Sequence, residues 1–454
     1  MNKKEIVKAI FLPLLICSTF ILCTTIAMLI YPEAFYKFFS PTQLFRENPP
    51  QLPHRSYYWD VEHYARLALN PSCNAFYPLW PFIIRTLFHP QTIEQAAHYC
   101  LVVATTLFFI STFIVFWVFQ TALQRLDLVF WLVLAYSVNP MAIFRVIGYT
   151  ESLFALLSTL FIWICLPKLK LNENLKLCLI FAITFLMALT RPVLLQILFS
   201  AIASLATIFY FQTLVITGSS RNKLFAIIHK YTHEVKTSIT ICVSALLGYS
   251  IYGSFCLITR GDFFATFQDQ KLWGKKFALH LELLLFPKSP LFDLLGLYLP
   301  AIILFVALIF VYFKLTQHEL QIFVPQSKLW NILLVYPPLL IILYLFHYFK
   351  SKKQAKLTKL ITNKHTQALS ENYIFWFSTY FCFIHCVIIF FTQDRLFSLA
   401  RFIFAVPFFF LSIGYIYLCV DNKKTYNTLF YFIFISAIAL FEQWANYSQD
   451  KWLG

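Results

Sequence analysis

Two acidic residues near the start of the chain, Asp60 and Glu62, have the types and spacing of a catalytic pair. They lie in "WDVEHY", beside Trp59, His63 and Tyr64, within a chain that is 60% hydrophobic. A carboxylate next to apolar surface can act as a general base that removes a proton from a hydroxyl group. The alternative is a pair of solvated loop acids among the aromatic residues that are common at membrane interfaces. These residues alone leave both interpretations open.

A third acid, Glu151 in "GYTESLFALL", begins an apolar segment. It is either a further catalytic acid or a residue whose charge stabilises the N-terminus of a helix. Arg145 lies within the apolar run before it, where an arginine needs a partner or a water-filled cavity. We therefore assign Glu151 to the candidate catalytic residues and Arg145 to substrate binding.

Two further arginines, Arg191 in "LTRPVLLQ" and Arg401 in "LARFIFAVP", stand at breaks between apolar runs. Arg191 either extends towards the membrane interface or binds a phosphate. Arginines beside carboxylates are typical of a site for an anionic lipid headgroup. Gln270 and Trp273 lie in "GDFFATFQDQKLWG", whose acids, amides and aromatic residues are typical of a sugar-binding loop. We assign all four residues to substrate binding.

The sequence indicates neither a dedicated metal site nor a nucleic-acid site. Eleven cysteines are scattered, mostly within apolar runs and without a CxxC pair, which predicts small buried hydrophobic residues. Cys382 and Cys386 lie four apart, but no other ligand cluster accompanies them. A divalent cation, Mg²⁺ or Mn²⁺, between the acids is left open, because a D-x-E pair does not require one. The net charge of +16 is concentrated in short loops, as in membrane proteins, and no nucleic-acid-binding motif is present.

The elements that position these residues are predicted to be membrane-spanning helices. Only 12% of the 454 residues are charged, about half the share in a soluble domain. Long apolar runs recur throughout, which predicts one all-α polytopic membrane domain, 1–454, with about 11–13 transmembrane helices. The first run is too long for the core of a signal peptide, so we expect it to be retained. Spans are expected near 8–30, 98–120, 128–147, 150–166, 175–190, 193–216, 237–258, 291–314, 329–348, 373–391, 402–420 and 425–441.

Lysine and arginine set the predicted orientation, with the N-terminus in the cytoplasm. Two full spans between 290 and 350 would place a six-lysine loop outside, so we expect either that one of them is re-entrant or lies on the surface, or that the chain has a further span. The outer face then carries a first long loop, 31–95, with Asp60 and Glu62, and a second long loop, 259–290. Glu151, Arg191 and Arg401 are expected on the same face. The basic loops expected in the cytoplasm are 168–176, 219–236, 350–370 and 421–424.

Five motifs taken in chain order resemble the PIG-V family, the GPI mannosyltransferase 2 type, and especially its bacterial-like members. They are "WDVEHYARLA…NAFYPLWPFIIR", "NPMAIFRVIGYTESLFALLS", "TRPVLL", "GDFFATFQDQKLWG" and "ARFIFAVPFF". The resemblance implies a GT-C glycosyltransferase fold with its active site on the luminal or periplasmic face. It places the key acid of the first outer loop on Asp60, the second acidic position on Glu151 and a basic position on Arg401. Trp59, His63 and Tyr64 are the motif neighbours of Asp60, and we assign them to substrate binding.

The function implied is transfer of a hexose, typically mannose, from a polyprenyl-phosphate donor to a hydroxyl of a glycolipid or glycan acceptor. We expect an inverting single displacement, in a bacterial inner membrane or an ER membrane whose lipids surround the protein. A lipid or solute transporter, such as a flippase, has the same composition, but polar clusters at one face favour the enzyme. A non-catalytic scaffold whose outer loops bind a partner is the third alternative.

Overall fold

The computed structural model describes residues 3–39, 60–215, 220–273, 277–285, 291–315, 321–322, 358–359, 368–393, 399–420, 425–449, 451 and 453. Trp59, the expected span at 329–348 and most of the basic loop at 350–370 therefore lie outside the described residues. For Trp273, the backbone but not the side chain is described.

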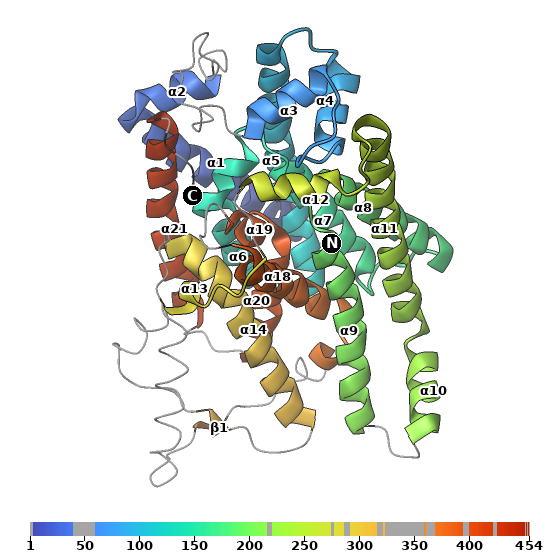
Figure 1. The fold of residues 1–454 in the computed structure, drawn as a ribbon. Helices are drawn as coiled ribbons and strands as arrows, with labels where there is room; N and C mark the ends of the chain where they lie inside the picture. The colour runs from blue at the N-terminus through green and yellow to red at the C-terminus, as the bar shows by residue number, and fades with distance from the viewer. Residues whose placement is uncertain are drawn as a thin grey trace.

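Helices make up nearly all of the described chain, which confirms the predicted all-α polytopic fold (Figure 1). Eight described helices are long and apolar enough to span a membrane: α1 (Lys3–Ile30), α5 (Ile93–Leu123), α8 (Glu173–Thr190), α9 (Leu194–Val215), α11 (Thr232–Arg260), α14 (Leu291–Leu315), α18 (Tyr373–Thr392) and α21 (Thr425–Ser448). Four shorter apolar helices are α4 (Leu79–Phe88), α6 (Leu126–Val138), α7 (Glu151–Cys165) and α20 (Pro407–Val420). The remaining elements are α2 (Pro32–Phe39), α3 (Asp60–Leu69), η2 (Pro140–Arg145), α10 (Ser220–Lys230), α12 (Ala265–Asp269), η3 (Gln270–Trp273), α13 (Glu282–Leu285), α19 (Arg401–Phe404) and the short paired strands β1 (Gln321–Ile322) and β2 (Thr358–Lys359).

Two expected spans are interrupted, and the cause in each case is local. The segment expected at 128–147 leaves the α-helix at Asn139, whose side chain accepts a hydrogen bond from the Met141 amide and so starts η2. The segment expected at 402–420 is broken between α19 and α20, directly before Pro407, which has no amide hydrogen to continue a helix. Both breaks place irregular backbone next to the candidate site.

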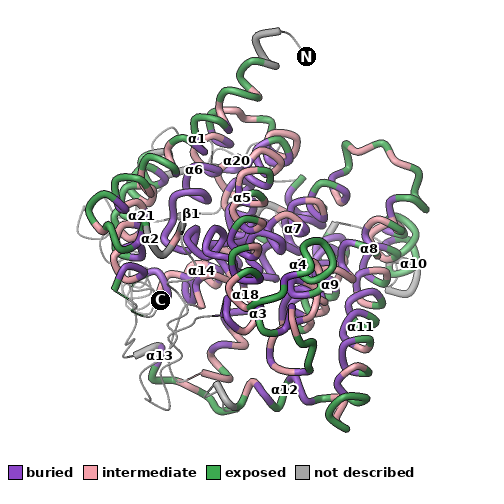
Figure 2. The backbone as a smooth tube through the Cα atoms, turned by 90° about the horizontal axis from the view of Figure 1, so that it is seen from above, coloured by how far each residue is buried: buried purple, intermediate pink, exposed green. Residues whose placement is uncertain are grey.

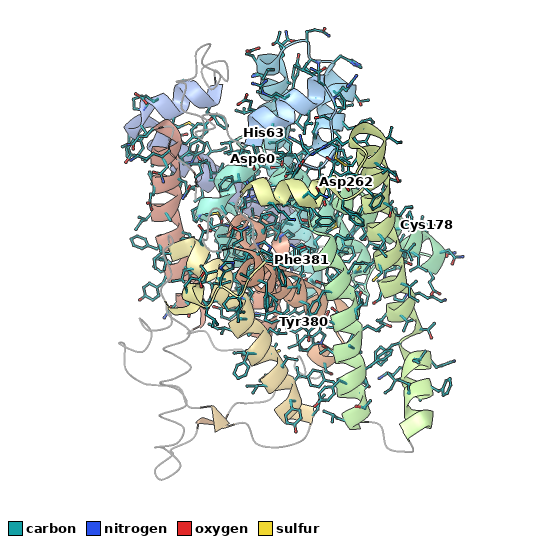
Figure 3. The ribbon with its side chains drawn as sticks, in the orientation of Figure 1. Asp60, His63, Cys178, Asp262, Tyr380 and Phe381 are labelled. Carbon is teal, nitrogen blue, oxygen red and sulfur yellow. A yellow bond between two sulfur atoms is a disulfide. The ribbon has the colours of Figure 1, made fainter. Side chains whose placement is uncertain are left out.

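The bundle buries a large apolar core, and many large apolar residues remain exposed. Figure 2 shows the buried residues gathered in the middle of the bundle and the exposed ones along its periphery. Within the bundle, α9 packs against α18 and α11, and α11 packs against α8. Leu29 on α1 and Ile258 on α11 are 76% and 84% exposed, which suits side chains that face lipid. Figure 1 shows α3 and α4 at the upper end of the molecule and α10 at the opposite end. Figure 3 shows Asp60 and His63 well above Tyr380 of α18.

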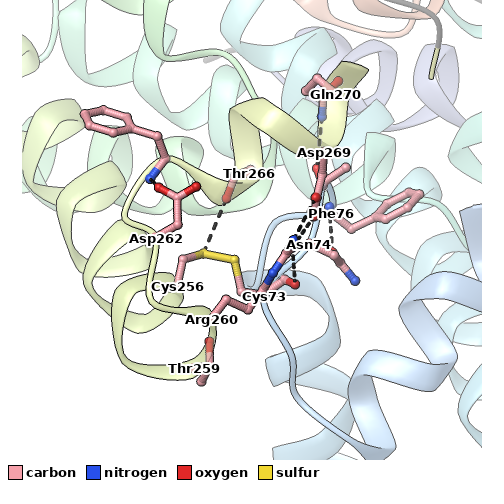
Figure 4. A network of polar contacts seen from close by, with 12 residues as sticks. Cys73, Asn74, Phe76, Cys256, Thr259, Arg260, Asp262, Thr266, Asp269 and Gln270 are labelled. Carbon is pink, nitrogen blue, oxygen red and sulfur yellow. Dashed lines mark hydrogen bonds and ion pairs between the residues drawn. A yellow bond between two sulfur atoms is a disulfide. The ribbon is translucent and has the colours of Figure 1, made fainter. Parts of the chain in front are cut away.

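A disulfide joins the loop after α3 to the end of α11 (Figure 4). It links Cys73 to Cys256, 183 residues further along, so the prediction that the cysteines are buried hydrophobic residues is wrong for these two. Local spacing does not reveal this pair, because helix packing brings the two cysteines together. Disulfides persist in oxidising compartments, which fits an extracytoplasmic location for this end of the bundle.

Polar contacts beside the disulfide fasten the segment that follows α11 to the loop after α3 (Figure 4). The Arg260 guanidinium forms an ion pair with Asp269 and donates to the Cys73 carbonyl over 3.2 Å. The Gln270 amide donates to the Ala75 carbonyl over 3.2 Å. The two predicted outer loops therefore form one connected structure.

We expect the denatured, unreduced protein to react with alkylating reagent at nine cysteines, and at all eleven after reduction. Mass spectrometry of the intact chain measures this difference of two groups. Cys73→Ser is the control, because its ten cysteines should all react without reduction. Eleven modified cysteines in the unreduced wild type would contradict the disulfide.

Candidate functional site

Four charged side chains from distant parts of the chain form a continuous series of ion pairs. Arg401 Nη1 lies 2.8 Å from Asp60 Oδ2, and Arg401 Nε lies 3.5 Å from Glu151 Oε1. Arg191 Nη2 lies 3.0 Å from the same Glu151 oxygen. The structure thus brings together four of the residues assigned from the sequence, in the order Asp60, Arg401, Glu151 and Arg191.

The series is buried unevenly. The side chains of Glu151 and Arg191 are 1% and 4% exposed, whereas those of Asp60 and Arg401 are 10% and 20% exposed. Two acids and two arginines balance in charge, which reduces the large cost of burying each charge alone. The Asp60–Arg401 end is therefore the end that solvent, or a ligand, reaches first.

Each acid occupies the start of a helix. Asp60 is the first residue of α3, and Glu151 is the first residue of α7. A negative charge at this position is stabilised by the unpaired amides and the dipole of the helix. The helix-stabilising role considered for Glu151 and a role in the site are thus compatible.

A glycine turn sets the direction of the chain just before Glu151. Gly148 has a φ of 93°, and a Cβ atom added to it would lie 3.2 Å from the Leu101 backbone nitrogen. The Trp80 indole of α4 donates to the Gly148 carbonyl over 3.1 Å. Only glycine combines this backbone conformation with so close an approach to α5.

An acid that sequence reasoning missed, Asp293, positions the segment around Arg401. Asp293 is 2% exposed, and its Oδ1 accepts a hydrogen bond from the Ala400 amide over 2.9 Å. Gly296, one turn later on α14, lets the helix approach closely, because a Cβ atom there would lie 3.1 Å from the Ala400 Cα. An acid in the first turn of a very apolar helix was the available signal.

Aromatic rings surround the two arginines. The Arg191 Cζ lies 3.9 Å from the centroid of Phe402, and the Arg401 Cζ lies 5.4 Å from that of Phe144 and 5.5 Å from that of Tyr149. Guanidinium groups at these distances are attracted to the faces of aromatic rings. The sequence had not singled out these three rings, because aromatic residues are frequent throughout the chain.

Two phenols beside the acids remain protonated at neutral pH. Burial, with the nearby Asp60 carboxylate, raises the pKa of Tyr64 and of Tyr149 above the usual value near 10. The Tyr64 hydroxyl lies 3.5 Å from the Thr150 hydroxyl, next to Glu151. Both phenols can therefore donate hydrogen bonds to an anion or a sugar hydroxyl.

Glu62 and His63 lie on the same short helix as Asp60 but make different contacts. Glu62 forms an ion pair with Arg66, whose Nε lies 2.7 Å from Glu62 Oε1. The His63 ring stacks on Phe76, with centroids 4.6 Å apart. His63 and Arg66 also line a surface pocket of about 330 Å³, which is large enough for a sugar-sized group.

Arg145 is fully buried beneath the site. Its Nη2 donates to the Tyr136 carbonyl over 2.7 Å, and its Cζ lies 3.9 Å from the Tyr136 centroid and 4.7 Å from the Phe108 centroid. Among the described residues, no carboxylate forms an ion pair with it. A carbonyl and two aromatic faces thus take the place of an acidic partner, while Arg145 Nε and Nη1 are buried without a hydrogen-bond partner among the described residues. The assignment of Arg145 to substrate binding stays a prediction.

Among the residues that the structure describes, there is no group of three or more His, Cys, Asp or Glu side chains that could hold a metal ion. Asp60 and Glu151 both pair with Arg401, and Glu62 pairs with Arg66. The chemistry apparent from this arrangement is recognition of an anion by arginine next to a carboxylate that can accept a proton.

Comparisons with known proteins find no family, curated protein or solved structure that matches the chain.

Glu151→Leu is expected to lower the melting temperature strongly, because a buried pair broken on one side costs about 3–5 kcal/mol. Glu151→Leu combined with Arg191→Met should recover part of the loss, since the remaining pair of Asp60 and Arg401 is again neutral. Thermal unfolding of purified protein in detergent measures both effects. Glu173→Gln, in an exposed pair with Lys236, is the control and should change little. A double variant less stable than Glu151→Leu would contradict the pairing.

Burial lowers the pKa of the His63 imidazole below its ordinary value of 6.5, although Asp60 and Glu62 oppose the shift. The unfolded chain therefore binds this proton more readily, and stability is lost as the pH falls below about 6.5 and through the folded pKa. We expect the melting temperature of wild type to fall between pH 7.5 and 5.5 by more than that of His63→Phe, which keeps the stack on Phe76. An equal fall in melting temperature in both proteins would contradict the lowered pKa of His63 in the folded protein.

Proposed function

We propose that the protein is a membrane glycosyltransferase that transfers a hexose from a polyprenyl-phosphate donor to a hydroxyl of a glycolipid or glycan acceptor. The proposal rests mainly on the ion-pair series Asp60–Arg401–Glu151–Arg191, which sets a carboxylate beside arginines at one end of the bundle. The sequence resemblance to the PIG-V family and its GT-C fold supports mannose as the sugar.

In the proposed reaction, Asp60 accepts the proton of the acceptor hydroxyl. The hydroxyl oxygen attacks the anomeric carbon and forms the new glycosidic bond. The bond between the anomeric carbon and the phosphate oxygen breaks, and the polyprenyl phosphate leaves with the electron pair. Arg401, with Arg191 behind it, stabilises the negative charge that develops on the phosphate. One displacement inverts the anomeric centre.

An apolar pocket near the site supports a lipid-linked donor. It has a volume of about 550 Å³ and lies between α1, α2, α5 and α21, with Phe20, Phe109 and Trp444 in its walls. Val146, in the loop that contains Tyr149 and leads to Glu151, also lines it. The disulfide between Cys73 and Cys256 supports a luminal or periplasmic location for this end of the molecule.

A transporter is the second candidate, and one observation favours it. A line of buried polar side chains runs along α9 towards the end of the bundle that carries α10. The Gln196 amide lies 3.4 Å from His385, and the Thr207 hydroxyl lies 2.6 Å from the Tyr380 hydroxyl of α18. Polar contacts between membrane helices also serve packing alone. The further members of the line are Ser200, Ser204 and Gln212.

Asp60→Asn is expected to reduce turnover about 100- to 10,000-fold, the range in which general bases contribute. The assay uses purified protein in membranes, a labelled polyprenyl-phosphate mannose and a glycolipid extract as acceptor. The matched control is Thr207→Val, which removes the hydroxyl paired with Tyr380 in the polar line that favours a transporter. If the protein is a glycosyltransferase, this variant should leave turnover unchanged. Unchanged turnover in a folded Asp60→Asn protein would exclude Asp60 as the base.

A further inference from the structure

Arg401 is the cation that the two acids of the site share. It contacts Asp60 over 2.8 Å and Glu151 over 3.5 Å. Glu151 has a second cation, Arg191, at 3.0 Å, whereas Arg401 is the only cation paired with Asp60 within the part of the chain that the structure describes. Removing Arg401 from the series would therefore leave Glu151 paired and Asp60 unpaired.

This arrangement is in conflict with the proposed role of Asp60. One of the two Asp60 carboxylate oxygens, Oδ2, accepts a hydrogen bond from Arg401 Nη1 over 2.8 Å, so a guanidinium occupies the place where an acceptor hydroxyl would donate. An acceptor hydroxyl thus needs Asp60 to be released before its proton can be removed.

The geometry indicates what could release it. The Arg401 side chain is 20% exposed, more than any of the other three in the series, so an incoming anion meets Arg401 first. Phosphate competes well for a guanidinium, because its oxygens match the two parallel N–H donors. Phe144, Tyr149 and Phe402 lie within 5.6 Å of the Arg401 Cζ and offer ring faces along which the cation can shift.

We propose that the phosphate of the lipid-linked donor displaces Asp60 from Arg401, so that the base becomes available only when the donor is bound. This inference rests on the proposed function, and it adds an order to the reaction, with the donor binding before the acceptor. Arg191 stays with Glu151 and keeps the buried half of the site in place. In the absence of donor, the Asp60–Arg401 pair keeps the base inactive.

The test measures binding of citronellyl phosphate, a short isoprenoid phosphate, to the full chain in detergent by calorimetry. Asp60→Asn removes the competing carboxylate and should bind the probe about fivefold more tightly than wild type, the effect of losing a partly exposed ion pair of about 1 kcal/mol. Arg401→Gln should bind it at least about tenfold more weakly. Glu173→Gln, which removes an acid near the other end of the bundle, should bind it like wild type. Inorganic phosphate should bind more weakly than the probe, because it has no apolar chain.

The outcomes separate this inference from the function on which it rests. Equal or weaker binding by Asp60→Asn, with normal binding and turnover by wild type, would overturn the exchange and leave the glycosyltransferase in place. Absence of both probe binding and turnover in wild type would overturn both. Should Asp60→Asn fail to fold, Asp60→Ser removes the same charge with a smaller side chain and is held to the same expectation.

Discussion

A buried charge in an apolar bundle must be paired, and this constraint organises the site. Four charged residues meet although up to 341 positions separate them, and each stands at the end of a helix or in a break between helices. Asp60 and Glu151 begin α3 and α7, Arg191 follows α8, and Arg401 begins α19. The acids lie at N-termini and Arg191 at a C-terminus, where helix dipoles favour them. Arg401 stands at an N-terminus, where the helix dipole disfavours a positive charge, so the two acids must stabilise the charge of Arg401.

The same logic explains how much the sequence could predict. A charged residue at a break in an apolar run is visible without a structure, which is why Asp60, Glu151, Arg191 and Arg401 were assigned to one face. Their pairing was not predictable, because it depends on how helices pack rather than on local spacing. The disulfide of Cys73 with Cys256 was missed for this reason. The helical membrane fold was predictable, since apolar runs of sufficient length are a local property.

Arg145 shows that an arginine within an apolar run can be buried without an acidic partner. The sequence argument required a partner or a cavity, and a substrate was the natural partner to expect. In the structure, the Tyr136 carbonyl and the faces of Tyr136 and Phe108 take that place. Rings and carbonyls are abundant in this chain and leave no sequence signature, so they could not be anticipated as partners for a cation.

The two arginines of the site differ in their surroundings, which suit Arg191 to stabilising the fold and Arg401 to binding a substrate. Arg191 is 4% exposed, stacks on Phe402 and pairs with an acid that is itself buried, so moving it would expose charge to an apolar core. Arg401 is more exposed and is divided between two acids, so exchanging one anion for another changes little in the core. A site that must keep its fold while it binds and releases an anion needs one arginine that stays in place and one that can exchange its partner. The Glu151–Arg191 pair fixes the helices, and the Asp60–Arg401 pair is the one that a substrate can rearrange.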